Sequence, residues 1–203
     1  YDGALRHAVG VHFYQAFRAN RTLAPEGGKV GWTYNHQPYL AYWNDRFYLQ
    51  YLSNLKDEHG APGRTLLMTS TDGRWWSKPK VVFPEYPLPE ITRTGVHVPA
   101  GMPSVMHQRM GFYTAPDGRL LTLGFYSYCP TPRDTPNKGQ GLGRVVREIY
   151  RNGKLGPIYF IRYNRHAGWN ETNTRYPFYR QSKDAGFVAA CEALLKDKLM
   201  TLQ

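Results

Sequence analysis

The feature that most constrains this chain is a series of short alternating apolar runs joined by tight polar turns. Alternation with a period of two predicts antiparallel strands rather than helices. The first four predicted strands are residues 37–43, 47–53, 64–71 and 77–83. Asn44-Asp45-Arg46 joins the first pair, and Asp72-Gly73 joins the last pair. This part of the chain therefore predicts one up-and-down sheet of four strands.

A second set of strands follows a proline-rich connection over residues 84–103. Its strands are predicted at 110–114, 119–126, 144–150 and 156–164. The last two flank Asn152-Gly153, which is among the strongest short hairpin signals. The two sets also begin alike, with His36-Gln37 in the first and His107-Gln108 in the second. A repeated four-stranded unit is typical of a β-propeller, whose innermost strands line a central channel.

We therefore expect an all-β propeller of four-stranded antiparallel blades, with about two blades in this chain at 37–83 and 105–164. Residues 182–202 carry apolar side chains at helical spacing and predict a C-terminal helical insertion, capped by Ser182 or Asp184. Propellers usually need at least four blades to close. Residues 1–203 are therefore expected to be a portion of one propeller domain, which needs the remaining blades.

The charge of the chain favours an anionic partner. There are 26 Lys and Arg residues against 15 Asp and Glu residues, giving a formal net charge of +11, and a positive field of this size attracts anions. The basic residues are scattered and form no recognised nucleic-acid motif, so nucleic acid is not the expected partner. An acidic polysaccharide explains the charge, and 16 Tyr with 5 Trp suit a sugar-stacking surface.

The cysteines and the apolar segments say less about the compartment. Cys129 and Cys191 are too few for a disulfide scaffold, and whether they pair is left open. The sequence has no apolar run of about 18 residues, so no membrane partner is expected. Because the chain begins at Tyr1 rather than Met, any signal segment is expected to have been removed or to lie outside this sequence.

The segment Ser70-Thr71-Asp72-Gly73-Arg74-Trp75-Trp76 resembles the Asp box of sialidase-type propellers. In that hairpin the Asp holds the turn and a Trp packs beneath it. The sialidase form usually has one more residue between Asp and Gly, so this is a shortened variant. The resemblance implies a propeller and carries no implication about sialic acid. The alternative is a plain Asp-Gly turn before a core Trp.

A longer stretch resembles one enzyme family. The similar residues are Gly31-Trp32-Thr33-Tyr34-Asn35-His36-Gln37-Pro38, residues 39–54, Glu58-His59, residues 62–68 and residues 101–113, continuing to the helix around Cys191. They look like the seven-bladed propeller enzymes that remove terminal L-rhamnose from glucuronate in arabinogalactan and gum arabic. These enzymes are described as α-L-rhamnosidases and as L-rhamnose-α-1,4-D-glucuronate lyases. The resemblance implies a seven-bladed whole, an acidic glycan substrate and a secreted or periplasmic location.

In that family a single His in the Tyr-Asn-His segment is identified with catalysis, and the matching residue here is His36. Elimination at glucuronate must remove the C5 proton and expel the rhamnose oxygen. An imidazole that is neutral near pH 7 suits the first task. His36 is therefore the predicted base, and also the acid towards the leaving oxygen, with His59, His107 or Tyr34 as its proton-transfer partner.

The carboxylate of the glucuronate needs a cationic partner, and Arg binds carboxylates bidentately. Arg93 and Arg109 are the predicted clamps, with His97 and Trp32 as further substrate-binding residues. Arg64 and Arg144 are placed less securely. For His107 and His97, a purely structural role as hydrogen-bonded scaffold groups stays open.

Two other functions stay open. Hydrolysis would ordinarily use two carboxylates, but Asp45, Asp72 and Asp117 are expected in turns, and Glu148 or Glu171 would be isolated candidates. The lack of an evident pair of catalytic carboxylates favours elimination over hydrolysis by an α-L-rhamnosidase. The second alternative is a glycan-binding propeller without catalysis.

Cofactors are expected to play no part in the chemistry. The His residues at 36, 59, 97, 107 and 166 lack metal-ligand spacing, so no metal site is predicted from them. The family resemblance allows a structural Ca²⁺ in the propeller channel.

Overall fold

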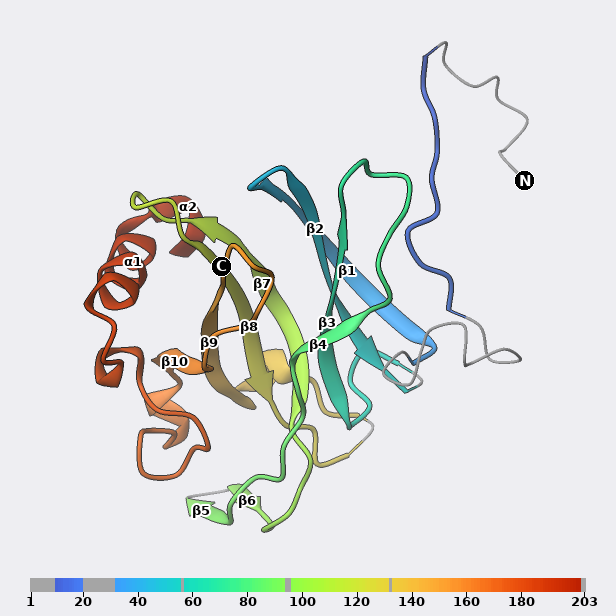
Figure 1. Cartoon of the computed structure of the whole chain (residues 1–203). Helices are drawn as coiled ribbons and strands as arrows, with labels where there is room; N and C mark the ends of the chain where they lie inside the picture. Colours follow the sequence, from blue (N-terminus) through green and yellow to red (C-terminus); the bar gives the residue numbers. More distant parts are fainter. Residues whose placement is uncertain (1–9, 20–31, 56, 94–95, 132, 202–203) are drawn as a thin grey trace.

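The computed structural model describes residues 10–19, 32–55, 57–93, 96–131 and 133–201. In this part of the chain two antiparallel sheets of four strands stand side by side, and helices cover the outer face of the second sheet (Figure 1). The predicted all-β propeller architecture with a short C-terminal helical region is confirmed.

Each sheet is a meander in which sequence neighbours pair. The first sheet has the order β1-β2-β3-β4 and the second the order β10-β9-β8-β7. The strands of the first sheet are β1 (Tyr34–Trp43), β2 (Arg46–Asn54), β3 (Gly63–Ser70) and β4 (Lys80–Phe83). Those of the second are β7 (Val105–Thr114), β8 (Leu120–Ser127), β9 (Gly141–Ile149) and β10 (Tyr159–Tyr163).

All eight predicted strands overlap observed ones, but the first strand of each sheet begins earlier than the alternation indicated. In β1 the register shifts between His36 and Tyr39, and Gln37 has a φ of 50°. In β7 the register shifts between His107 and Gly111. A bulge interrupts the period of two, which hides the first residues of the strand from a pattern search. Both interruptions directly follow a histidine.

One pair of strands was not predicted. Within the proline-rich connection, β5 (Ile91–Arg93) pairs with β6 (Val96–Val98) in a small hairpin. Three-residue strands are too short to give a detectable alternation, so the sequence indicated only a loop here.

The main core lies between the two sheets. Leu52 and Leu67 of the first sheet and Met106 and Val145 of the second are fully buried in one cluster. Tyr48 of β2 also meets the ring of Phe112 on β7 edge to face, at 6.4 Å between centroids. This packing holds β7 against the first sheet.

A buried polar bridge crosses the same interface. The Gln50 amide on β2 donates a hydrogen bond to the Leu123 carbonyl oxygen at 2.6 Å and accepts one from the Thr122 hydroxyl at 2.8 Å. Gln50 is fully buried, so both partners would be left unsatisfied without it.

We therefore expect Gln50→Ala to lower the free energy of unfolding by about 2 kcal/mol, the cost of stranding buried polar groups. Urea unfolding of the variant measures this loss. Gln15→Ala is the matched control, because Gln15 is exposed. Equal stability of the two variants would contradict a stabilising role of the bridge.

The helices pack on the second sheet. The helix α1 (Ala185–Lys196) buries Phe187, Cys191 and Leu194 in a cluster with side chains of β8, β9 and β10. Of the two predicted caps, Asp184 caps this helix, accepting a hydrogen bond from the Phe187 amide at 3.0 Å.

The single helix predicted over 182–202 is broken into two. Asp197 ends α1, and its carboxylate accepts a hydrogen bond from the Leu199 amide at 2.9 Å, which starts α2 (Lys198–Thr201). A side chain that caps a new helix competes with continuation of the old one.

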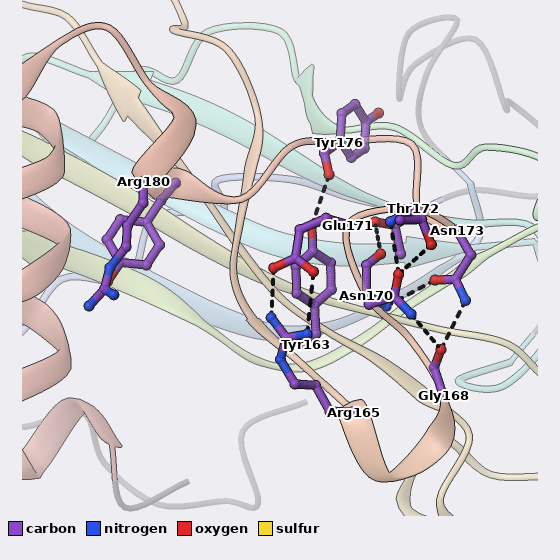
Figure 2. A network of polar contacts seen from close by, with 11 residues as sticks. Tyr163, Arg165, Gly168, Asn170, Glu171, Thr172, Asn173, Tyr176 and Arg180 are labelled. Carbon is purple, nitrogen blue, oxygen red and sulfur yellow. Dashed lines mark hydrogen bonds and ion pairs between the residues drawn. The ribbon is translucent and has the colours of Figure 1, made fainter.

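The loop after β10 is held by its own polar contacts, shown in Figure 2. Arg165 pairs with Glu171 at 2.6 Å, and the Asn173 amide donates to the Gly168 carbonyl oxygen at 2.9 Å. Trp169, in the same loop, is buried and packs against the ring of Tyr128. The loop is therefore a folded cover of the second sheet.

The segment predicted to be an Asp box forms a compact turn. The Asp72 carboxylate accepts hydrogen bonds from the amides of Arg74 and Trp75, which lower its pKa. Trp76 is the indole that packs inward, against a cluster around Tyr51, whereas Trp75 is 82% exposed.

Both cysteines are free thiols in the structure, with Cys191 buried in α1. The question that the sequence left open is thus answered for this structure. No helix among the described residues is long and apolar enough to cross a membrane.

Candidate functional site

The candidate site lies where the first strands of the two sheets begin. β2 ends at Asn54 and β3 begins at Gly63, so the loop between them lies at this end of the first sheet. A Cβ at Gly63 would lie 2.5 Å from the Asn54 side-chain oxygen and 3.0 Å from the Met106 backbone nitrogen on β7. Glycine at this position therefore lets the loop and β7 approach closely.

The loop between β2 and β3 is held in place by two side chains. The Asn54 amide, which is buried, donates a hydrogen bond to the Glu58 carbonyl oxygen at 2.7 Å. The Asp57 carboxylate accepts hydrogen bonds from the backbone amides of His59 and Gly60, at 3.1 and 2.6 Å. These contacts define where Glu58 and His59 project.

Three imidazoles converge on the carboxylate of Glu58. Its Oε1 lies 3.2 Å from Nε2 of His107 and 3.8 Å from Nε2 of His36. Its Oε2 lies 4.0 Å from Nε2 of His59. The rings of His59 and His107 are also stacked, at 5.4 Å between centroids. The structure therefore gathers three of the predicted catalytic residues around one acidic group.

These groups differ in their access to solvent. The side chain of His36 is 44% exposed, and that of His107 is 1% exposed. Glu58 and His59 are intermediate, at 25% and 29%. Only an accessible group can exchange a proton with a bound glycan, so His36 is the imidazole best placed to touch a substrate. His107 is placed to hold Glu58.

Tyr34, the fourth predicted catalytic residue, is next to the same group. Its ring lies 5.8 Å from that of His36 between centroids. Burial, together with the negative charges of Glu58 and Asp57, raises the pKa of Tyr34. The phenol is therefore a neutral hydrogen-bond donor near pH 7.

Sequence reasoning did not single out Glu58 as a carboxylate of the site, and this is a correction to the expectation that none stands out. Glu58 lies in an irregular loop, where no periodicity marks a side chain as facing a site. Its position directly before His59 was the only available signal.

The two carboxylates that the sequence offered instead have structural partners. Glu148 pairs with Arg119 at 2.8 Å and is largely buried, which raises its pKa. Glu171 pairs with Arg165 in the folded loop of Figure 2. Neither is brought to Glu58 by any contact that the structure describes.

The predicted substrate-binding residue Trp32 is covered on one face. The Arg64 guanidinium lies 3.5 Å above its ring centroid and pairs with Glu85 at 2.8 Å. Only the other face of the indole is left for a ligand. Arg64 lies opposite Ser53 on β2, near the start of β3, and so belongs to this end of the first sheet.

Of the other predicted substrate-binding residues, only His97 has a described side chain, and its described hydrogen-bond contact is with Thr92. His97 is exposed on β6, and its Nδ1 lies 3.0 Å from the Thr92 hydroxyl. Arg93 lies on β5 and Arg109 on β7, but their side chains lie outside the described residues. Their role as carboxylate clamps stays a prediction.

The cluster also contains metal-ligand atoms in close proximity. One ligand atom from each of Glu58, His59 and His107 lies within 4.8 Å of the others. The spacing of these residues along the sequence did not indicate a metal site, because tertiary packing, not sequence proximity, brings His107 on β7 to the loop that carries Glu58 and His59.

Solved structures similar to this chain were found. A solved structure named "Sialidase" is 50% identical in sequence, with a TM-score of 0.85, over 94% of this chain. The chain spans only 18% of that protein's length. A xylan β-1,4-xylosidase from Bacillus halodurans C-125 is 21% identical with a TM-score of 0.38, over 68% of this chain and 22% of that protein. Among curated proteins no match was found.

A family model matches the whole sequence. Residues 1–203 fit the model described as BT_1020-like, N-terminal beta propeller. The two four-stranded sheets agree with that description. The chain therefore belongs to the BT_1020-like family of N-terminal β-propellers, and its fold is similar to part of a protein named sialidase.

Proposed function

We propose that this chain supplies part of the active site of an enzyme that cleaves a terminal glycosidic bond at an acidic sugar, with His36 as the proton-transfer residue. The observation that carries the proposal is the exposed His36 imidazole 3.8 Å from the Glu58 carboxylate, at the bulged start of β1. A carboxylate beside an imidazole can hold the ring in one orientation.

Two further observations support an acidic substrate. The formal net charge of +11 attracts anionic glycans. The relative at 50% identity carries the name sialidase, and sialic acid is a sugar with a carboxylate. Such glycans are found outside cells, so the proposed location is secreted or periplasmic.

We favour hydrolysis as the reaction. In this proposal His36 protonates the oxygen of the departing group, because it is the accessible imidazole, and Glu58, 3.8 Å away, orients its ring. Tyr34 donates a hydrogen bond to the sugar. His107, which is buried, positions Glu58. Groups on the rest of the propeller complete the pocket and activate water.

Elimination of L-rhamnose from glucuronate is the second candidate. The observation that favours it is that Glu58 is the only carboxylate in contact with this imidazole cluster among the described residues, while a hydrolase ordinarily uses two. In this reaction His36 would remove the C5 proton of glucuronate and return a proton to the leaving oxygen. Neither reaction needs a cofactor for its proton transfers.

One assay separates these reactions. Full-length protein is incubated with a sialic-acid-capped glycan and, separately, with a rhamnose-capped arabinogalactan. We expect release of the terminal sugar without the ultraviolet absorbance of an unsaturated uronate. Release of rhamnose with that absorbance would favour elimination instead. If no acid-containing glycan loses its terminal sugar, the catalytic proposal fails, and binding without catalysis is tested by affinity electrophoresis on the same glycans.

A further inference from the structure

We propose that Glu58, His59 and His107 form a binding site for a divalent transition-metal ion of the Zn²⁺ type. These residues offer one carboxylate and two imidazoles, a set of ligands that zinc accepts when three protein groups leave a further coordination position open. The site goes beyond the proposed reaction: it does not include His36, although it shares Glu58 and His107 with that reaction.

The distances in the cluster suit one ion. Ligand atoms about 2.1 Å from a tetrahedral Zn²⁺ lie roughly 3.4 Å from one another. The observed separations from the Glu58 oxygens are 3.2 Å to His107 and 4.0 Å to His59. All three ligand atoms lie within 4.8 Å of one another. Small rotations of the side chains would bring them to coordination distance.

The ligands are supported by ordered surroundings. His107 is 1% exposed on β7, and its ring stacks on that of His59. The Asn54 side chain donates a hydrogen bond to the Glu58 carbonyl oxygen, and the His59 amide donates one to the Asp57 carboxylate. These bonds hold the backbone of both ligand residues in place. Supporting contacts of this kind hold ligands in place before a metal binds. The ion would link the β2–β3 loop of the first sheet to the second sheet.

The ligand chemistry distinguishes this site from a calcium site. Ca²⁺ takes six to eight oxygen ligands, whereas imidazole suits Zn²⁺ and other transition metals. Two of the three ligands here are imidazoles. The expected order of affinity is therefore Zn²⁺ well above Ca²⁺.

The test measures metal binding rather than activity. Full-length protein without a histidine tag is stripped with a chelator and titrated with Zn²⁺ by calorimetry, and bound metal is counted after dialysis. We expect His59→Ala to weaken Zn²⁺ binding more than about 100-fold, since even supporting partners of metal ligands cost 10- to 100-fold. Because His59 is partly exposed, this variant is expected to fold. Glu58→Gln, which keeps the shape of the side chain, should weaken binding similarly.

His166→Ala is the matched control, because His166 is exposed and does not belong to the group. It should bind Zn²⁺ like the unchanged protein. The proposal would be overturned if the native protein bound no Zn²⁺, or if His59→Ala bound it as tightly as His166→Ala did. If the native protein cleaves the glycan but binds no Zn²⁺, the metal site is rejected and the proposed reaction stands.

Discussion

Replacing His36 by Ala is expected to slow release of the terminal sugar by about 100- to 10,000-fold, the usual contribution of a general acid or base. His36 is the accessible imidazole of the cluster, at 44% exposure, and lies 3.8 Å from Glu58. Its removal takes away the proposed proton donor without opening the core. The measurement is the initial rate of sugar release by the full-length protein, at a saturating concentration of glycan.

The control for this prediction has two parts. His166→Ala removes an exposed imidazole elsewhere and should keep the rate. Thermal unfolding of His36→Ala should match that of the unchanged protein, since substitutions at exposed positions usually change stability by less than about 0.5 kcal/mol. A His36→Ala variant that keeps the native rate would show that His36 is a scaffold group.

Gly143→Ala is expected to lower the free energy of unfolding by about 3 to 5 kcal/mol, through combined backbone strain and overpacking. Gly143 lies in β9 with a φ of 154°, which side chains rarely adopt. A Cβ there would overlap the carbonyl oxygen of Arg162 on β10 and lie 3.0 Å from the Cα of Tyr163. Backbone atoms of a paired strand cannot move aside without breaking the pairing.

Urea unfolding measures this loss, and Gly139→Ala separates its two causes. Gly139 also has a positive φ, 87°, but a Cβ there would meet nothing within 4 Å. This control should cost only about 1 to 2 kcal/mol, the strain of the left-handed region. Equal losses in the two variants would mean that the clash with β10 contributes nothing.

The strands were predictable because their signal is local. In β2 the side chains of Tyr48, Gln50 and Leu52 face one side of the sheet, and the residues between them face the other. A strand with one buried face therefore shows apolar side chains at every second residue, which a local search detects. The turns at Asn44-Asp45 and Asn152-Gly153 are equally local. The β5–β6 hairpin and the break at Asp197 were missed because three-residue strands and a single capping carboxylate leave almost no periodic trace.

The candidate site was predictable only in part. The family resemblance pointed to His36, and the need for a proton-transfer partner added His59, His107 and Tyr34. The structure places the three histidines around Glu58 and Tyr34 beside His36. Nothing in the sequence gave reason to expect a carboxylate among these residues. Arg64 lies near the start of β3, where it has Glu85 as a partner.

By itself the sequence determined the two four-stranded units, their turns and the capped helix, because these depend on side chains a few positions apart. Only the tertiary structure decided that Glu58 meets His107. That contact requires an irregular loop, a glycine that permits close approach at Gly63, and the packing of β7 against the first sheet. Contacts between residues distant in the chain depend on how the sheets pack, and no local pattern encodes that packing.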